Sequence, residues 1–251
     1  MPSFGICHLS LIPVRKTASE RSEMTTQLLF GETFEILDID GSWSLIRSSF
    51  DGYEGWVTSA MITPLSEAEF ENYPKIYGSV VKSPVCEVIP EEAGFPATFL
   101  AGGSNLPDRL RNIVRDKQVS VYQPGMPYDL ITTAKQYLNA PYLWGGRTIF
   151  GIDCSGFTQL VYKSNGIAIP RDAYQQAELG VTVELAGVRP GDLAFFENQE
   201  GRITHTGIVL ENSEIIHASG WVHIDRLDVS GIYNYEIKKY THKLRIIKRI
   251  V

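Results

Sequence analysis

One cysteine stands where its neighbours could make it a nucleophile. Cys154 follows Asp153, precedes Ser155 and begins the stretch CSGFTQLVYKSNG, whose apolar spacing predicts a helix. The first turn of a helix leaves backbone N–H groups unpaired and carries a partial positive charge, which stabilises a thiolate over a thiol. We therefore predict a lowered pKa for Cys154, while a buried structural cysteine at a helix start would fit the same motif.

Two histidines downstream could supply the base that such a cysteine needs. His205 in ITHTGIVL and His217 in EIIHASG lie inside predicted strands, where an ionisable side chain is unusual unless it is hydrogen-bonded or used. A cysteine nucleophile needs a base within hydrogen-bond reach and a third group that orients the base. The other histidines, His8, His223 and His242, lie in less constrained settings and are predicted to have no partner of this kind.

The two strand histidines must share one face of neighbouring antiparallel strands in order to act together. A two-residue turn at Asn212-Ser213 would pair Glu211 with Glu214 and place the histidines on opposite faces. A three-residue turn or a bulge would return them to one face. We therefore predict an odd-length connection between these strands.

The residues after Pro124 predict the elements that would position this site. YDLITTAKQYL has a helical spacing, PYLWGGRTIFGID is a loop punctuated by glycines, and DLAFFEN, ITHTGIVLEN, SEIIHASG and KLRIIKRI indicate strands. A helix that carries a cysteine, followed by an antiparallel sheet that carries histidines, is the arrangement of a papain-like α+β nucleophile site. We predict this domain over residues 124–251.

The front of the chain predicts a different architecture. Over residues 1–63, short apolar stretches alternate with turn signals such as DIDG and SFDG, which indicates a small antiparallel barrel. SEAEFENYP, within a linker over residues 64–74, predicts a short helix or linker ended by proline. Strand-like pieces over residues 75–123 predict a second, degenerate barrel.

Composition and charge exclude several classes of function. The 251 residues carry a net charge of -6, so the chain has no basic field for nucleic acid. No apolar run approaches the about 20 residues that a membrane-spanning helix needs, and the first residues do not have the pattern of a signal peptide. We expect a cytoplasmic protein, or a periplasmic or extracellular one if an export signal upstream was removed.

The cysteine count bears on disulfides and metals. Cys7, Cys86 and Cys154 are too few for a disulfide framework, and no metal-type Cys/His spacing accompanies them. Cys7 and Cys86 are predicted to be small buried hydrophobic residues. We expect no metal and no organic cofactor.

The motifs together resemble the NlpC family of bacterial cell-wall cysteine peptidases. PYLWGG, DCSGF, PRDAYQQA, RPGDLAFF, HTGIVL and IIHAS occur in the order of that family over roughly the last half of the chain. The front end is similar to the bacterial SH3-like barrels that often precede this catalytic domain. Within the family, the combination is most similar to the γ-D-glutamyl-L-diamino acid endopeptidases, also called dipeptidyl-peptidase VI. The resemblance implies an α+β fold, with a papain-like cysteine peptidase domain preceded by small all-β SH3-like barrels.

The resemblance also implies a role for each candidate residue. Cys154 would be the nucleophile, His205 the base and His217 the orienting group. Tyr142 and the backbone N–H of Cys154 would stabilise the oxyanion. The implied substrate-binding residues are Asp153 and Ser155 beside the nucleophile, Trp144, Arg171 and Asp172 in the pocket, and Tyr53 and Glu23 from the barrel, for the last five of which packing or surface pairing is an equally good explanation.

The implied reaction is hydrolysis of the γ-D-glutamyl bond to meso-diaminopimelate or lysine through an acyl-enzyme. The substrates would be peptidoglycan-derived peptides with a free N-terminal L-alanine, and the enzyme would be a monomer. Two alternatives remain open. The same site could run acyl transfer or transglutamination, or the chain could be a wall-binding module whose catalytic half is vestigial. Retention of Cys154, His205 and His217 argues against the binding module, because such a module needs none of them.

Overall fold

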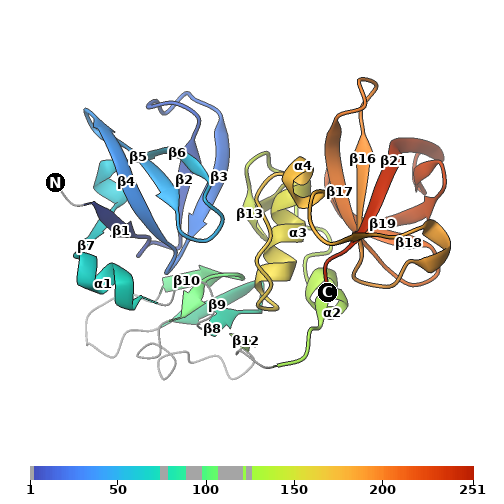
Figure 1. Cartoon of the computed structure of the whole chain (residues 1–251), viewed down its shortest axis with the longest axis horizontal. Coiled ribbons are helices and arrows are strands. Elements are labelled where there is room, and N and C mark those ends of the chain that lie inside the picture. Colours follow the sequence, from blue (N-terminus) through green and yellow to red (C-terminus); the bar gives the residue numbers. More distant parts are fainter. Residues whose placement is uncertain (1–2, 74–78, 89–97, 107–120, 123–125) are drawn as a thin grey trace.

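The computed structural model of the chain describes residues 3–73, 79–88, 98–106, 121–122 and 126–251. Figure 1 shows a blue β-structure formed by the front of the chain and an orange and red β-structure formed by its end, with helix α3 in yellow between them. Two small green sheets lie below. Residues from the front of the chain can therefore contact residues from its end around α3, between the two β-structures.

The front of the chain forms an antiparallel sheet, as predicted. Its seven strands run in the order β3-β2-β6-β5-β4-β1-β7 around a core that includes Ile12, Leu28 and Phe34. Cys7 is buried in the same core, which confirms the prediction for this residue. The strands are β1 (Phe4–Ile6), β2 (Leu11–Arg15), β3 (Met24–Leu29), β4 (Thr33–Asp40), β5 (Trp43–Ser48), β6 (Glu54–Thr58) and β7 (Thr63–Leu65).

A short helix follows this sheet, where the sequence predicts one. Helix α1 (Glu67–Asn72) begins at a capping box in which Ser66 and Glu69 bond each other's backbone N–H groups. Beyond it, β9 (Val85–Val88) pairs with β10 (Thr98–Ala101). The second small sheet has the order β11 (Asn105–Leu106), β8 (Ser79–Val81) and β12 (Val121–Tyr122). Much of the predicted second barrel lies outside the described residues, so it stays a prediction, whereas Cys86 is buried as expected.

The end of the chain forms a closed sheet with helices beside it. The strands run in the order β15-β21-β16-β17-β18-β19-β20, and β20 also pairs with β21, which closes six of them into a barrel. The elements are α2 (Leu130–Lys135), β13 (Arg147–Thr148), β14 (Gly151–Ile152), α3 (Cys154–Lys163), α4 (Ala173–Gln176), β15 (Val181–Thr182), β16 (Leu193–Glu197), β17 (Ile203–Val209), β18 (Glu214–Ser219), β19 (Trp221–Asp228), β20 (Gly231–Asn234) and β21 (Lys239–Arg249), with short 3₁₀ turns at Ser59–Met61 and Leu185–Gly187.

Helix α3 is held against this sheet by its apolar face. Phe157, Leu160 and Val161 are fully buried in one cluster with Phe195 of β16 and Ile208 of β17. Because Phe157 lies one turn after Cys154, this packing fixes the start of the helix beside β17.

The connection between β17 and β18 has the predicted odd length. Gly207 pairs with His217, and the N–H of Leu210 donates to the carbonyl oxygen of Glu214, so three residues lie between the paired positions 210 and 214. Asn212 and Ser213 both have φ near 57°, which lets the chain turn tightly. With this register, His205 and His217 share one face of the sheet, and the prediction is confirmed.

A buried ion cluster joins the front sheet to β13 and α3. Glu32, at the end of the turn between β3 and β4, accepts hydrogen bonds at 3.0 Å from both Nη atoms of Arg147 in β13 and one from Lys163 in α3. The Glu32 side chain is fully buried, and those of its two partners are 2% exposed. Because each charge in the cluster needs the others, the relative position of the front sheet and α3 is tightly specified.

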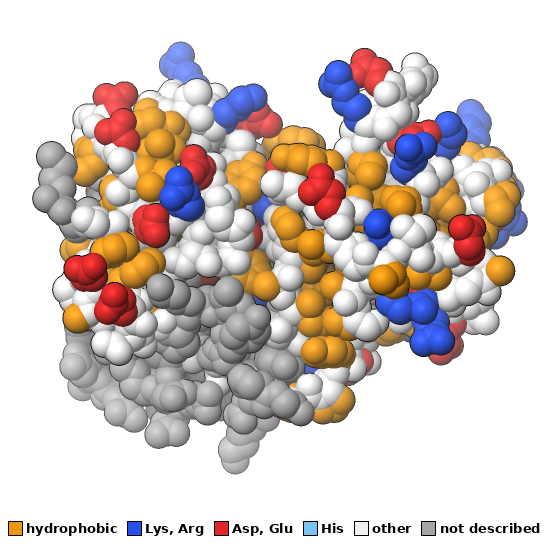
Figure 2. All heavy atoms as spheres, viewed as in Figure 1, with side chains coloured by type: hydrophobic (Ala, Val, Ile, Leu, Met, Phe, Trp, Pro, Cys, Tyr) orange, Lys and Arg blue, Asp and Glu red, His pale blue; other side chains and the backbone are white. Residues whose placement is uncertain are grey.

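The described residues on the face shown in Figure 2 form no large field of one charge. Acidic and basic side chains are interspersed over the face shown in Figure 2, with hydrophobic side chains between them. Among the described residues, no helix is both long enough and apolar enough to cross a bilayer.

Candidate active site

The cysteine lies at the first position of helix α3, as the sequence predicts. Asp153 caps the helix, since its Oδ1 accepts the N–H of Gly156 at 2.7 Å. The Cys154 thiol donates to the carbonyl oxygen of Thr204 at 3.9 Å. Thr204 directly precedes His205 in β17, so the thiol lies beside the strand that carries the predicted base.

The thiol is not activated in the resting structure, and the predicted lowered pKa is wrong. Burial and, to a lesser extent, the negative charge of Asp153 raise the pKa of Cys154 to about 12. Loss of water and the adjacent carboxylate therefore outweigh the partial positive charge of the helix start. The resting nucleophile is a neutral thiol, which must lose its proton to a base as it attacks.

This state predicts how the free enzyme reacts with an alkylating agent. Labelling of Cys154 by iodoacetamide is expected to be slow at pH 6 and to rise continuously through pH 9, because the thiolate fraction grows toward a pKa of about 12. Mass spectrometry of the labelled protein measures the rate, and Cys154→Ala identifies the background from Cys7 and Cys86. A fast rate that is constant from pH 5 to pH 8 would show a preformed thiolate.

The two predicted histidines form a hydrogen-bonded chain. His205 Nε2 and His217 Nδ1 are 2.9 Å apart, and His217 Nε2 is 3.3 Å from Asp225 Oδ2. Burial lowers the pKa of His205 well below its ordinary value, and the neighbouring histidines lower it further. The pKa of His217 is also lowered, mainly by burial. Both rings are therefore neutral at neutral pH, and a neutral imidazole can accept the thiol proton.

Two histidines that the sequence left without partners do have them, so that prediction is wrong. His223 Nε2 lies 3.1 Å from Asp225 Oδ2. The His242 ring stacks on the His205 ring, with 4.0 Å between the centroids. The pairing of His217 with His223 across β18 and β19 places His223 and Asp225 on the face of the catalytic histidines. In a strand, residues two positions apart lie on one face, so the spacing of His223 and Asp225 in the segment HIDRLD was the sequence signal that could have identified Asp225.

A cavity of about 610 Å³ opens between the front sheet and α3, above the nucleophile. Lys16 and Thr204, which the sequence did not single out, line it together with Thr25, Glu54, Ala173, Tyr174 and Ile203. The cavity also collects eight of the predicted residues: Glu23, Tyr53, Trp144, Asp153, Cys154, Ser155, Arg171 and Asp172.

The other predicted residues lie on the far side of the nucleophile. Tyr142, His205 and His242 line a second cavity of about 300 Å³, and Thr204 lines both cavities. His217 is buried behind His205. Burial raises the pKa of Tyr142, so its phenol is protonated at neutral pH and can donate a hydrogen bond to an oxyanion. The Cys154 thiol thus lines the large cavity and bonds Thr204, the residue that both cavities share.

Three predicted substrate-binding residues, Asp153, Ser155 and Arg171, are joined by hydrogen bonds. Both Nη atoms of Arg171 donate to the carboxylate of Asp153, and Nη1 also donates to Ser155 Oγ at 2.9 Å. Arg171 Nε reaches Thr26 in β3 at 2.9 Å. Arg171 is 2% exposed, so its interpretation as a surface pair is wrong. This network fixes the start of α3, and contacts of its members with the substrate stay predictions.

The front sheet contributes an acidic group to the large cavity. Glu23 accepts the Trp144 indole N–H at 2.8 Å on one carboxylate oxygen, and Lys16 lies 3.3 Å from the other. Tyr53 lies near Asp172, whose charge together with burial raises the pKa of the phenol. Lys16 pairs with Glu23, and Arg171 pairs with Asp153. Two further acidic residues, Glu54 and Asp172, line the cavity, and a cationic group that entered it would be attracted to them.

Known proteins resemble the chain over both halves. Residues 139–245 match the family model described as the NlpC/P60 family, and residues 14–62 match the model described as the bacterial dipeptidyl-peptidase Sh3 domain. The gamma-D-glutamyl-L-lysine dipeptidyl-peptidase of Bacillus subtilis is 31% identical over 217 residues, which cover 77% of this chain and 71% of that protein. The protein of the same name from Bacillus cereus is 29% identical over 228 residues, which cover 78% of this chain and 68% of that protein.

A solved structure shares the fold. The NlpC/P60 family protein from Bacillus cereus superimposes with a TM-score of 0.81 at 22% identity, and the match covers 99% of both chains. This likeness and the two matched models confirm the predicted fold class, a papain-like domain behind an SH3-like all-β region. The predicted domain limits at residues 63, 74 and 123 stay predictions.

Proposed function

The chain belongs to the NlpC/P60 family and is a cysteine peptidase, and from that premise we propose that it hydrolyses the γ-D-glutamyl bond to a diamino acid. Its substrates are peptidoglycan-derived peptides, in line with the γ-D-glutamyl-L-lysine bond that the names of its relatives specify. One observation supports this reaction above the others. A thiol at a helix start lines the large cavity and bonds the carbonyl oxygen of Thr204, which directly precedes the first of two hydrogen-bonded, neutral histidines.

The arrangement supports attack by a thiol that loses its proton in the same step. His205 takes the Cys154 proton while the sulfur attacks the carbonyl carbon, and His217 holds the His205 ring. The Tyr142 phenol and the N–H of Cys154 stabilise the oxyanion. The protonated His205 then donates to the departing amine, which leaves an acyl-enzyme, and a water molecule activated by His205 completes the hydrolysis.

The wall of the large cavity supports a preference for a free amino terminus. Glu23 and Tyr53 of the front sheet and Asp172 line the cavity beside the nucleophile. A desolvated ammonium needs a carboxylate partner, and a charged hydrogen bond is worth about 1.5–3 kcal/mol. We infer that the L-alanine ammonium of the substrate takes the place of the Lys16 ammonium at Glu23.

The amine preference predicts a matched set of rates. N-acetylation of L-Ala-γ-D-Glu-L-Lys is expected to reduce kcat/KM about 10–150-fold, the equivalent of one charged hydrogen bond. Glu23→Gln is expected to reduce kcat/KM for the free peptide by a similar factor and to change the acetylated peptide little. Glu20→Gln is the control, because Glu20 is exposed in the same connection between β2 and β3 and pairs with Arg15. Equal kcat/KM values for the two peptides would contradict recognition of the amine, but would not contradict the peptidase activity.

Acyl transfer is separated from hydrolysis by the products. A transferase would place an added amine, such as glycinamide, on the γ-carboxyl of D-glutamate, whereas a hydrolase releases the free acid. Mass spectrometry of reactions with and without the amine distinguishes the two masses. We expect the free acid in both.

A further inference from the structure

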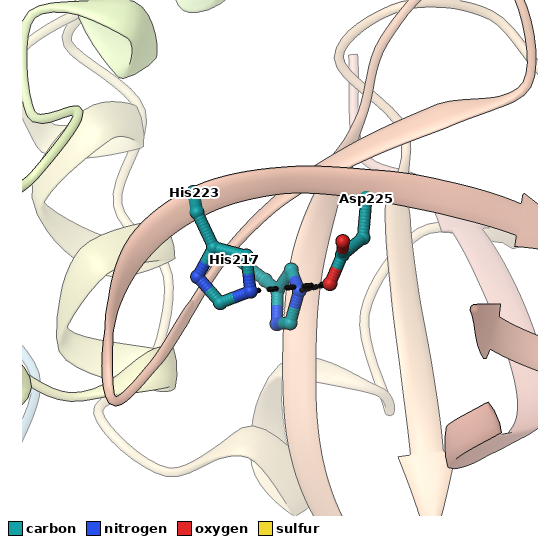
Figure 3. Close-up of side chains that lie close together, drawn as sticks. All are labelled: His217, His223 and Asp225. Carbon is teal, nitrogen blue, oxygen red and sulfur yellow. Dashed lines mark hydrogen bonds and ion pairs between the residues drawn. The ribbon is translucent and has the colours of Figure 1, made fainter. Parts of the chain in front are cut away.

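One buried carboxylate collects the hydrogen bonds at the end of the histidine chain. Figure 3 shows His217 and His223 next to Asp225. Asp225 Oδ2 lies 3.3 Å from His217 Nε2, 3.1 Å from His223 Nε2 and 2.9 Å from Asn234 Nδ2. Its Oδ1 accepts the backbone N–H of Tyr235 at 3.0 Å. Asp225 is 1% exposed, so these contacts are made away from water.

The charge state of this carboxylate follows from its contacts. Burial alone would raise the pKa of Asp225, but the hydrogen bonds from His217, Tyr235 and Asn234 lower it below its ordinary value. Asp225 is therefore ionised at neutral pH and can only accept hydrogen bonds.

An acceptor at this end fixes the position of every proton along the chain. His217 must carry its proton on Nε2 to donate to Asp225, so its Nδ1 holds a lone pair. That lone pair accepts from His205, which must then carry its proton on Nε2. His205 Nδ1 is left with a lone pair, and this is the nitrogen that can take a proton from the nucleophile. The opposite tautomers would leave His205 unable to act as a base.

We propose that Asp225 is a positioning residue that sets the tautomers of His217 and His205 and so makes His205 the base toward Cys154. The inference rests on the proposed function only for the reaction that the base serves, because the proton positions follow from the hydrogen bonds. Asp225 acts through the two histidines, because the hydrogen bonds run from its carboxylate to His217 and from His217 to His205.

A metal ion would demand the reverse arrangement. His217, His223 and Asp225 offer ligand atoms within 4.8 Å of one another, a spacing that a metal could use. A bound metal would take the lone pair of His217 Nε2 and move the His217 proton to Nδ1. His205 would then accept at Nε2 and carry its proton on Nδ1, where it could not serve Cys154. A metal at this cluster and a basic His205 therefore exclude each other, which makes the metal a decisive outcome of the test.

The variant Asp225→Asn tests the tautomers, because its amide has a preferred orientation. Tyr235 donates to Oδ1 from the main chain, whereas Asn234 donates to Oδ2 from a side chain that can turn away, so the amide oxygen is expected at the position of Oδ1 and the NH₂ group at that of Oδ2. The NH₂ group then donates to His217 Nε2 and reverses both tautomers. The variant should keep its substrate contacts and lose its base, so kcat should fall about 10³–10⁴-fold with KM little changed, the scale known for a wrong tautomer in a hydrolase triad.

The decisive readout is the position of the protons, which needs no substrate. In ¹⁵N NMR of the full chain as Cys154→Ala, we expect the proton of both His205 and His217 on Nε2, and in Cys154→Ala with Asp225→Asn we expect it on Nδ1. Asp228→Asn is the matched control, because Asp228 lies in the same strand and bonds Arg226 and Tyr240 instead. This control should keep the kcat of the wild type and the wild-type proton positions.

Several outcomes would overturn the inference. Unchanged proton positions in Asp225→Asn would do so, as would a loss of activity in folded Asp225→Asn and Asp225→Ala that keep the proton positions of the wild type. Activity that is lost on dialysis against a chelator and restored by added Zn²⁺ would show that Asp225 belongs to a metal site and would contradict the positioning role. If the tautomers reverse as expected but the wild type cleaves no peptide, the positioning role stands and the proposed function fails.

Discussion

Replacement of Cys154 by alanine is expected to reduce kcat about 10⁶-fold, the scale at which a hydrolase loses its nucleophile. Cys154 is the one cysteine among the described residues that lines either cavity, because Cys7 and Cys86 are buried in the two front cores. Steady-state hydrolysis of L-Ala-γ-D-Glu-L-Lys measures the loss. Cys7→Ala is the control and should retain kcat, since Cys7 lies in the core of the front sheet.

The same experiment tests the role of His205. His205→Ala should cost nearly as much as Cys154→Ala, and the double variant should be no worse than either, because nucleophile and base act as one unit. Effects of the two changes that multiply would indicate independent roles. Activity in Cys154→Ala above about one hundredth of the wild type would contradict the assignment of the nucleophile.

Replacement of Glu32 by alanine is expected to lower the free energy of unfolding by about 3–5 kcal/mol, because it leaves two buried cations without their carboxylate. Arg147 and Lys163 both contact Glu32 at the junction of the front sheet and α3. Urea unfolding of the full chain measures the change. Glu35→Ala is the control, since Glu35 pairs with Arg47 on the surface at 3.5 Å and such pairs are worth about 0–1 kcal/mol. Equal losses in the two variants would contradict a special role for the cluster.

The ion cluster also predicts the acid stability of the protein. Burial would raise the pKa of Glu32, but Arg147 and Lys163 lower it to about 2. A carboxyl whose folded pKa lies below its unfolded value stabilises the fold above the unfolded pKa and loses that contribution as the pH falls through the folded one. The difference in stability between wild type and Glu32→Ala should therefore be constant at neutral pH and shrink between about pH 4.5 and pH 2. A difference that does not depend on pH would contradict this cause.

The sequence identified the parts of the site that local rules determine. Helix α3 follows from the apolar spacing after Cys154, and the shared face of His205 and His217 follows from the arithmetic of an odd-length turn. Asp225 was within reach of the same rules, because alternation along β19 and its pairing with β18 place it beside His217. Asp225 is not among the residues predicted from the sequence, because His223, two residues before it, has no partner that the sequence alone reveals.

Other features depend on tertiary packing that no local pattern reveals. His242 reaches the His205 ring only because β21 pairs with both β16 and β20, with a register shift in each pairing. The direction of the Cys154 pKa depends on how completely α3 and β17 exclude water from the thiol. The contact between Glu23 and Trp144 joins residues far apart in the chain, and it depends on the packing of the front sheet against β13 and α3, where Glu32 bonds Arg147 and Lys163.

The central claim is that Cys154 catalyses hydrolysis of the bond between γ-D-glutamate and the diamino acid. Its most direct test is mass spectrometry of the products from L-Ala-γ-D-Glu-L-Lys-D-Ala, incubated with wild type and with Cys154→Ala. We predict two products, L-Ala-D-Glu and L-Lys-D-Ala, with the wild type and neither with the variant. Release of single amino acids from either end, the same products from Cys154→Ala, or an uncleaved peptide would contradict the account.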